Sequence, residues 1–200
     1  MVGSQKVHYA NFNSHRAKGM ISDILPPDYV SGLVDGEGCF VLGFRRDKKY
    51  QRKGQPEYFY WKVSFAIALR RDDKALLEKV KNTLGCGRVC VSKDTVQYRV
   101  NKIDDLKHKI LSFFLENPLF GKKREDFILW AEALDILYQN YLKWKITIRN
   151  HKGQRGFPKM KLEAADTQRL LLIKQQMENY KSKRPTWKWL STLDEVKYEY

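Results

Sequence analysis

The stretch Val30-Ser31-Gly32-Leu33-Val34-Asp35-Gly36-Glu37-Gly38 combines small residues at helical spacing with an acidic residue just before its last glycine. It follows Pro26-Pro27, and proline is best tolerated in the first turn of a helix. In such a helix Gly32 and Gly36 lie on one face, which lets a second helix approach the backbone closely. We expect Gly38 to end the helix.

Glu37 then lies at the negative end of the helix dipole, where a carboxylate is disfavoured by about 0.3–1 kcal/mol. If the second helix belongs to an identical copy related by a two-fold axis, two Glu37 carboxylates come together and repel each other. Divalent cations relieve that repulsion. Carboxylate, carbonyl and water oxygens suit Mg²⁺ better than zinc or copper, so the stretch predicts a shared metal site.

This stretch resembles the signature of the LAGLIDADG homing endonucleases: Gly32 and Asp35 are retained, and Glu37 stands where the signature has aspartate. The resemblance implies that Glu37 is catalytic and binds the metal, with the carbonyl of Gly36 as a further ligand. It also implies a dimer interface at Ser31, Gly32, Asp35 and Gly36. The alternative is an ordinary core helix that ends at a glycine before a strand.

The composition favours a polyanionic partner, because 38 Lys and Arg against 23 Asp and Glu give a net charge of +15. Ribosomal proteins share that balance. No apolar run approaches the roughly 20 residues of a membrane span, and no apolar core of a secretory signal follows the start. The cysteines, Cys39, Cys86 and Cys90, lack zinc-site spacing, which predicts reduced intracellular thiols. The chain is expected in an organelle or in a bacterial cytoplasm.

Alternation of apolar and polar residues predicts strands over 40–45, 58–70, 88–92 and 95–101. Helical patterns follow from Asp72 or Asp73 to 84, over 103–116 and over 123–138. The order α-ββ-α-ββ-α predicts an α+β fold. The resemblance, which covers residues 24 to 145, implies a four-stranded antiparallel saddle-shaped sheet backed by helices.

Three parts are predicted: an N-terminal basic arm over 1–23, the core over 24–145, and a basic loop with a C-terminal helical extension over 146–200. The composition of the arm also resembles an organellar transit peptide. The tract Lys145 to Lys161 is predicted to be a loop that contacts phosphates, or a solvated linker. Asp166 is expected to cap the last helix, and Trp187 and Trp189 to pack this extension on the core.

The polar faces of the strands suit the major groove of DNA, which admits a two-stranded β-ribbon. Lys48 and Lys49, in the link between the first two strands, are expected to contact phosphates. The alternative is that the polar faces are merely solvated. The residues expected to read bases are Arg45, Tyr60, Lys62, Ser64, Arg70, Arg88, Ser92, Gln97, Arg99 and Asn101.

The resemblance implies that Lys123 is the active-site lysine, with Lys122 as the alternative. The family's polar residue at the end of the second strand falls near Leu69 or Arg70, and Arg70 is the chemically suitable occupant. Lysine at this site helps to stabilise developing negative charge.

The sequence thus predicts a homing endonuclease that makes a double-strand break in a DNA target by Mg²⁺-dependent phosphodiester hydrolysis and promotes mobility of its host intron. The chain carries one copy of the motif, so a homodimer is expected. Mn²⁺ should substitute for Mg²⁺, and Ca²⁺ should support binding without cleavage. The alternatives are a maturase that binds structured intron RNA and a DNA-binding protein whose nuclease has decayed.

Overall fold

The computed structural model describes residues 23–48, 57–150 and 162–180, and it has the predicted α+β order. The first half contains α1 (Pro27–Glu37), β1 (Gly38–Lys48), β2 (Glu57–Arg70), a 3₁₀ turn η1 (Arg71–Asp73) and α2 (Lys74–Leu84). The second half contains β3 (Arg88–Val91), β4 (Thr95–Val100), α3 (Ile103–Asp105), a π-helical segment η2 (Leu106–Leu111), α4 (Ser112–Glu116), α5 (Lys123–Asn150) and α6 (Ala164–Glu178).

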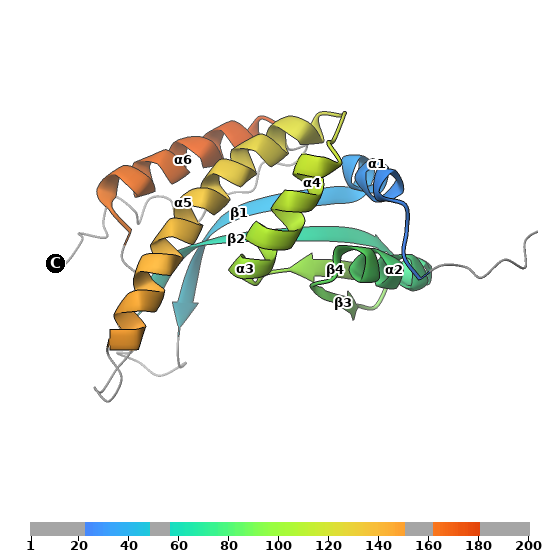
Figure 1. The fold of residues 1–200 in the computed structure, drawn as a ribbon, viewed down its shortest axis with the longest axis horizontal. Helices are drawn as coiled ribbons and strands as arrows, with labels where there is room; N and C mark the ends of the chain where they lie inside the picture. The colour runs from blue at the N-terminus through green and yellow to red at the C-terminus, as the bar shows by residue number, and fades with distance from the viewer. Residues whose placement is uncertain (1–22, 49–56, 151–161, 181–200) are drawn as a thin grey trace, which may run out of the picture.

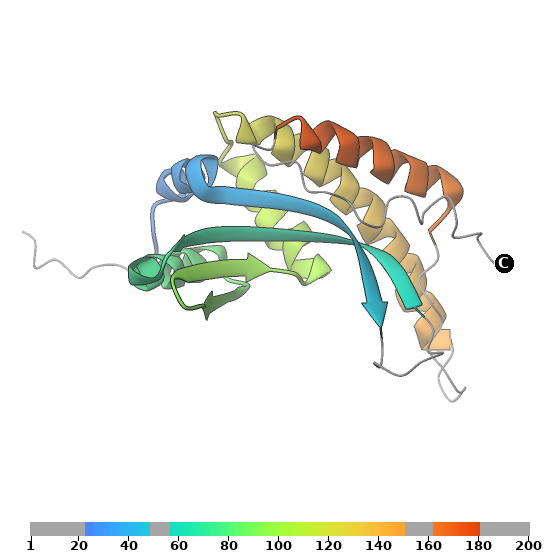
Figure 2. The same ribbon diagram turned by 180° about the vertical axis from the view of Figure 1, so that it is seen from behind.

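The four strands form one antiparallel sheet, as expected, and their order in it is β1-β2-β4-β3. The helices α4 and α5 cross one face of this sheet (Figure 1). Seen from behind, the strands lie in front of these helices and curve along their length (Figure 2). Among the described residues, the helices therefore pack on one face of the sheet and leave the other face uncovered.

Aromatic side chains fill the space between sheet and helices. The ring of Phe40 lies 5.1 Å from those of Phe65 and Trp130 and 5.7 Å from that of Phe114, measured between centroids. Tyr98 of β4 is fully buried, and its hydroxyl donates a hydrogen bond to the carbonyl of Cys86 at 3.0 Å. Most residues of the apolar faces predicted on β1, β2 and β4 thus lie in the core, and the polar faces point away from it. On β3 the prediction is only partly met, because Val89 is partly buried whereas Val91 is 45% exposed.

Gly38 ends α1, as predicted, but not through a left-handed backbone. Its φ of −71° and ψ of 154° are extended, and its N–H donates to the carbonyl of Val34. A Cβ at Gly38 would lie 2.5 Å from Val34 Cγ1 and 2.7 Å from the Val34 carbonyl oxygen. Glycine is required here because β1 leaves the helix too closely for a side chain.

The C-terminal part differs from the sequence expectation in two places. Helix α5 runs to Asn150, so the start of the tract predicted to be a loop is helical. Helix α6 begins at Ala164, and Asp166 does not cap it but accepts a hydrogen bond from Asn140 Nδ2 at 2.7 Å. The α6 residues facing α5 include Leu170, Ile173 and Met177, which are fully buried.

The predicted N-terminal arm up to residue 22, the rest of the basic tract, Trp187 and Trp189 lie outside the described residues. Within the described part, none of the helices has the length and apolarity needed to cross a membrane.

Candidate active site and nucleic-acid interface

Helix α1 presents different pairs of residues, spaced four apart, to different surroundings. Val30 and Val34 are fully buried and fix the helix to the core. Gly32 and Gly36 are exposed, and a Cβ at either position would meet nothing within 4 Å. Among the described residues, nothing therefore covers the glycine face of α1, which leaves room for another helix.

Ser31 and Asp35 form a third face, which holds the loop between α4 and α5. Ser31 Oγ donates to the carbonyl of Asn117 at 3.0 Å. The carboxylate of Asp35 accepts from the N–H of Phe120 at 2.9 Å and from the N–H of Gly121 at 3.2 Å. The side chains of Ser31 and Asp35, predicted at a dimer interface, are thus engaged within the chain, whereas Gly32 and Gly36 lie on the open face.

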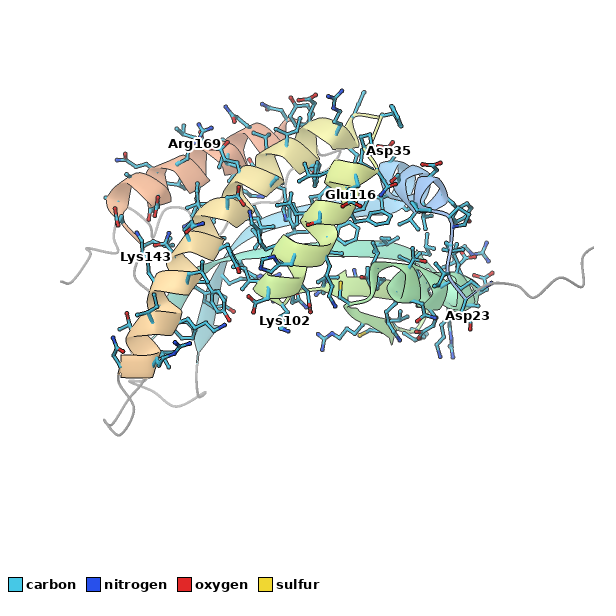
Figure 3. All side chains as sticks on the ribbon, in the orientation of Figure 1. Asp23, Asp35, Lys102, Glu116, Lys143 and Arg169 are labelled. Carbon is cyan, nitrogen blue, oxygen red and sulfur yellow. The ribbon has the colours of Figure 1, made fainter. Side chains whose placement is uncertain are left out.

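The two predicted catalytic residues lie at the ends of these connected elements. Glu37 is the exposed last residue of α1, and Lys123 is the half-buried first residue of α5. Lys122 is exposed and precedes the helix. Figure 3 shows Asp35 on the side of α1 that faces the end of α4, where Glu116 is labelled.

The described residues of one chain supply few ligands for a metal ion. Within residues 23–48, 57–150 and 162–180, no three His, Cys, Asp or Glu side chains gather into a metal-binding cluster. Glu37 and the backbone at the end of α1 offer the hard oxygens that Mg²⁺ prefers, but an octahedral site needs more of them. The residues fit such a metal when a second carboxylate comes from another copy of α1.

Four cationic side chains gather on the face of the sheet away from the helices. The strand register places Arg99 of β4 opposite Arg88 of β3 and also opposite Ala66 of β2. Burial lowers the pKa of Lys62, and the guanidinium groups of Arg45, Arg99 and Arg88 lower it further. We call Arg45, Lys62, Arg88 and Arg99 the cationic patch, and its charge suits a phosphate backbone.

Gln97 and Tyr60 share this face of the sheet with the cationic patch. Arg99 Nη2 donates to Gln97 Oε1 at 2.8 Å, and Tyr60 is paired with Arg45 in the register and remains 40% exposed. Ser64 is on the same face but is only 9% exposed, so its hydroxyl is poorly placed to reach a base. This face of the sheet therefore has amide and phenol groups beside the charged ones, a mixture that suits recognition of base edges.

The other predicted DNA contacts lie toward the ends of the strands. Arg70 is exposed and pairs with Asp72 at 3.5 Å, whereas Leu69 packs against the core. Ser92 lies in the β3–β4 turn, where its N–H donates to the carbonyl of Thr95 at 2.8 Å. Asn101 is half-buried at the end of β4.

The side chains of the two predicted phosphate contacts, Lys48 and Lys49, lie outside the described residues, and Lys102 is a further basic residue on this surface. Lys48 ends β1, but its side chain and all of Lys49 lie outside the described residues. Lys102 lines the same shallow hollow as Arg88 and Arg99. Lys102 was not among the predicted contacts because it follows the last residue of the alternating pattern.

A sequence model of the LAGLIDADG endonuclease family matches residues 30–134, more than half of the chain. A probable intron-encoded DNA endonuclease of Mycosarcoma maydis is 36% identical over 103 residues, which are 51% of this chain and 34% of that protein. An uncharacterised protein of an ND4 intron in Podospora anserina is 36% identical over 114 residues, 56% of this chain and 24% of that protein. The chain thus spans about a quarter to a third of the length of these relatives.

Solved structures resemble the fold as well. The meganuclease I-AabMI, bound to uncleaved DNA, superimposes with a TM-score of 0.51 at 31% identity and covers 63% of this chain, which corresponds to 42% of that one. The homing endonuclease I-TnaI has a TM-score of 0.51 at 28% identity, and the match covers 77% of this chain and 99% of that chain.

Proposed function

The chain belongs to the LAGLIDADG endonuclease family, and we propose that it makes a site-specific double-strand break in DNA by metal-dependent phosphodiester hydrolysis. We further propose that this activity promotes mobility of a host intron. Relatives described as intron-encoded endonucleases support the association with introns.

One observation carries the proposal: the same helix has an open glycine face and an exposed carboxylate at its end. A Cβ added at Gly32 or Gly36 would have no neighbouring atom within 4 Å, so a second α1 can pack against these glycines. Two-fold packing then brings a Glu37 from each copy to one place. Because the match spans nearly all of I-TnaI but under half of I-AabMI, the described core corresponds to one whole chain of the former. This supports a homodimer.

The pair of Glu37 carboxylates and the carbonyl of Gly36 would hold Mg²⁺, or Mn²⁺ in its place. When bound there, Mg²⁺ would supply an activated water molecule and would neutralise charge on the phosphate. Lys123, at the start of α5, would contribute a positive charge that stabilises the negative charge developing on the phosphate oxygens. Arg70 is the proposed polar contributor from the end of β2.

The cationic patch is proposed to bind DNA along the curved sheet. Its guanidinium groups can form bidentate hydrogen bonds with guanine edges, and Gln97 can do so with adenine. The meganuclease I-AabMI, whose fold is similar, was solved bound to uncleaved DNA, which supports DNA as the partner of this chain.

Cleavage of an intronless exon junction tests the proposal. The wild-type protein is incubated with a duplex of the flanking exons and Mg²⁺, and both strands should be cut within the junction. Glu37→Gln removes the charge but keeps the shape, so cleavage should fall by about two orders of magnitude or more while DNA binding persists. Glu116→Gln, an exposed carboxylate at the end of another helix, is the matched control and should cut normally.

Cutting by Glu37→Gln at the wild-type rate would contradict the proposed site. No cutting by the wild type, together with tight binding to folded intron RNA, would contradict the proposed function and favour an RNA-binding maturase.

A further inference from the structure

We infer that Asp35 is a positioning residue that fixes Lys123 relative to Glu37. This inference rests on the proposed function. Asp35 precedes Glu37 by two residues on α1, and the Gly121 amide that it binds precedes Lys123 by two residues. One carboxylate therefore joins the two segments that carry the proposed catalytic groups.

Both oxygens of Asp35 are used in this connection. Oδ2 accepts from Phe120 N–H at 2.9 Å, and Oδ1 accepts from Gly121 N–H at 3.2 Å. The next backbone bond, from Arg124 N–H to the carbonyl of Gly121 at 3.0 Å, begins the first turn of α5. Hydrogen bonds from amides to a carboxylate are stronger than those between neutral groups, so the start of α5 is tied firmly to α1.

Gly121 is part of the same arrangement. A Cβ there would lie 3.2 Å from Asp35 Oδ1 and 3.4 Å from Asp35 Cγ, so a side chain would push the carboxylate away from the amides. The loop thus has glycine where the carboxylate approaches most closely. A carboxylate that merely faced a partner helix would not need such close contact with its own chain.

The hydrogen bonds of Asp35 matter for catalysis because they hold the loop before α5, and with it Lys123, in place relative to α1. Lys123 is half-buried at the first residue of a helix whose preceding loop contacts α1 through Asp35 and Ser31. Displacing a catalytic group by about 1 Å can reduce the rate about a hundredfold. A looser loop would therefore lower the cleavage rate without removing any group that touches DNA or metal.

The substitution Asp35→Asn tests this role, because an amide keeps the shape but presents an NH₂ donor to one of the two backbone N–H groups. Single-turnover cleavage should slow by about ten- to a hundredfold, whereas DNA affinity should stay unchanged. Asp135→Asn is the matched control: it removes an exposed carboxylate of α5 that pairs with Lys107, and cleavage should be normal. Gly121→Ala should slow cleavage in the same way as Asp35→Asn.

A double-mutant cycle separates positioning from a general loss of structure. If Asp35 acts through Lys123, then Asp35→Asn adds no further slowing to Lys123→Met. Independent, multiplicative effects of the two substitutions would overturn the inference.

Hydrogen exchange provides a readout that does not need cleavage. The amides of Phe120 and Gly121 should be protected in the wild type and should exchange at least tenfold faster in Asp35→Asn. Unchanged protection would overturn the inference whatever the cleavage rates. An inactive Glu37→Gln beside a fully active Asp35→Asn would overturn the positioning role alone, whereas an active Glu37→Gln would overturn the proposed function.

Discussion

Substitutions at Gly32 should affect the stability of a single chain and the association of two chains differently. Within the chain, a side chain at this exposed position meets nothing within 4 Å. Alanine is favoured over glycine inside a helix by about 0.8–1.0 kcal/mol. Gly32→Ala should therefore raise the free energy of unfolding of the isolated chain by about 1 kcal/mol.

A bulkier substitution at Gly32 should weaken association of the dimer. Gly32→Leu adds bulk at a contact where two helices approach closely, and overpacking costs about 1–3 kcal/mol at each site. The two-fold axis doubles this to about 2–6 kcal/mol, which is about a 30-fold to 20,000-fold rise in the dimer Kd. Cleavage should be lost at protein concentrations where the wild type is dimeric.

Sedimentation velocity over a range of concentrations measures the dimer Kd, and urea unfolding at low concentration measures the stability of the chain. Asn82→Leu, which adds the same side chain at an exposed position of α2, is the control and should leave the dimer Kd unchanged. A Gly32→Leu protein with the wild-type dimer Kd would refute packing through this face. So would a wild-type monomer that cuts both strands.

Two further outcomes follow from the local geometry. Gly38→Ala places a Cβ 2.5 Å from Val34 Cγ1, so it should lower the free energy of unfolding, measured with urea, by about 1–3 kcal/mol. Cleavage should also be slower, because Gly38 is next to Glu37. A wild-type free energy of unfolding would contradict the close approach of β1 to α1. Burial and the nearby guanidinium groups lower the pKa of Lys62 from its ordinary 10.5, so DNA affinity measured by fluorescence anisotropy should weaken as pH rises toward 10, earlier than for an exposed lysine. Because the pKa of Lys62 is lower in the folded protein than in the unfolded one, deprotonation of Lys62 raises the free energy of unfolding as pH rises toward 10.5. Lys62→Arg should abolish the pH dependence of binding in this range, and an identical pH profile in both proteins would contradict the role of Lys62.

The sheet and most helix limits could be predicted because their signals are local. Alternation along β2 and β4 places Trp61 and Tyr98 in the core, and Gly85 ends α2 with the left-handed φ of 63° expected of a helix-terminating glycine. The end of α1 at Gly38 was also predicted, but the reason is steric contact with Val34, which the sequence does not reveal.

Long-range partners could not be predicted. Asp35 bonds to amides 85 and 86 residues away along the chain, and nothing near Asp35 in the sequence distinguishes this role from a dimer contact. Asp166 was expected to cap α6, but Asn140 of α5 takes its carboxylate. The tract 145–161 was predicted to be a loop from its basic residues, two glycines and a proline, but the glycines and the proline all follow residue 150, and helix α5 extends to Asn150.

The candidate site could be predicted only in part, because some of its features depend on local sequence and others on long-range contacts. A motif on one helix identifies Glu37 and the glycines, whereas the gathering of Arg45, Lys62, Arg88 and Arg99 depends on strand register. Alternation gives the face on which each residue lies. It does not give the order of strands, which places Arg99 between β2 and β3.

The most direct test of the central claim is anomalous scattering from Mn²⁺ in a crystal of the protein bound to its DNA target. We predict an anomalous peak about 2 Å from the Glu37 carboxylates of two copies related by a two-fold axis, next to a DNA phosphate. The same crystal form of Glu37→Gln should show no peak there. A metal ion bound elsewhere on the chain, or one that persists in Glu37→Gln, would contradict the claim that paired Glu37 carboxylates hold the metal that cuts DNA.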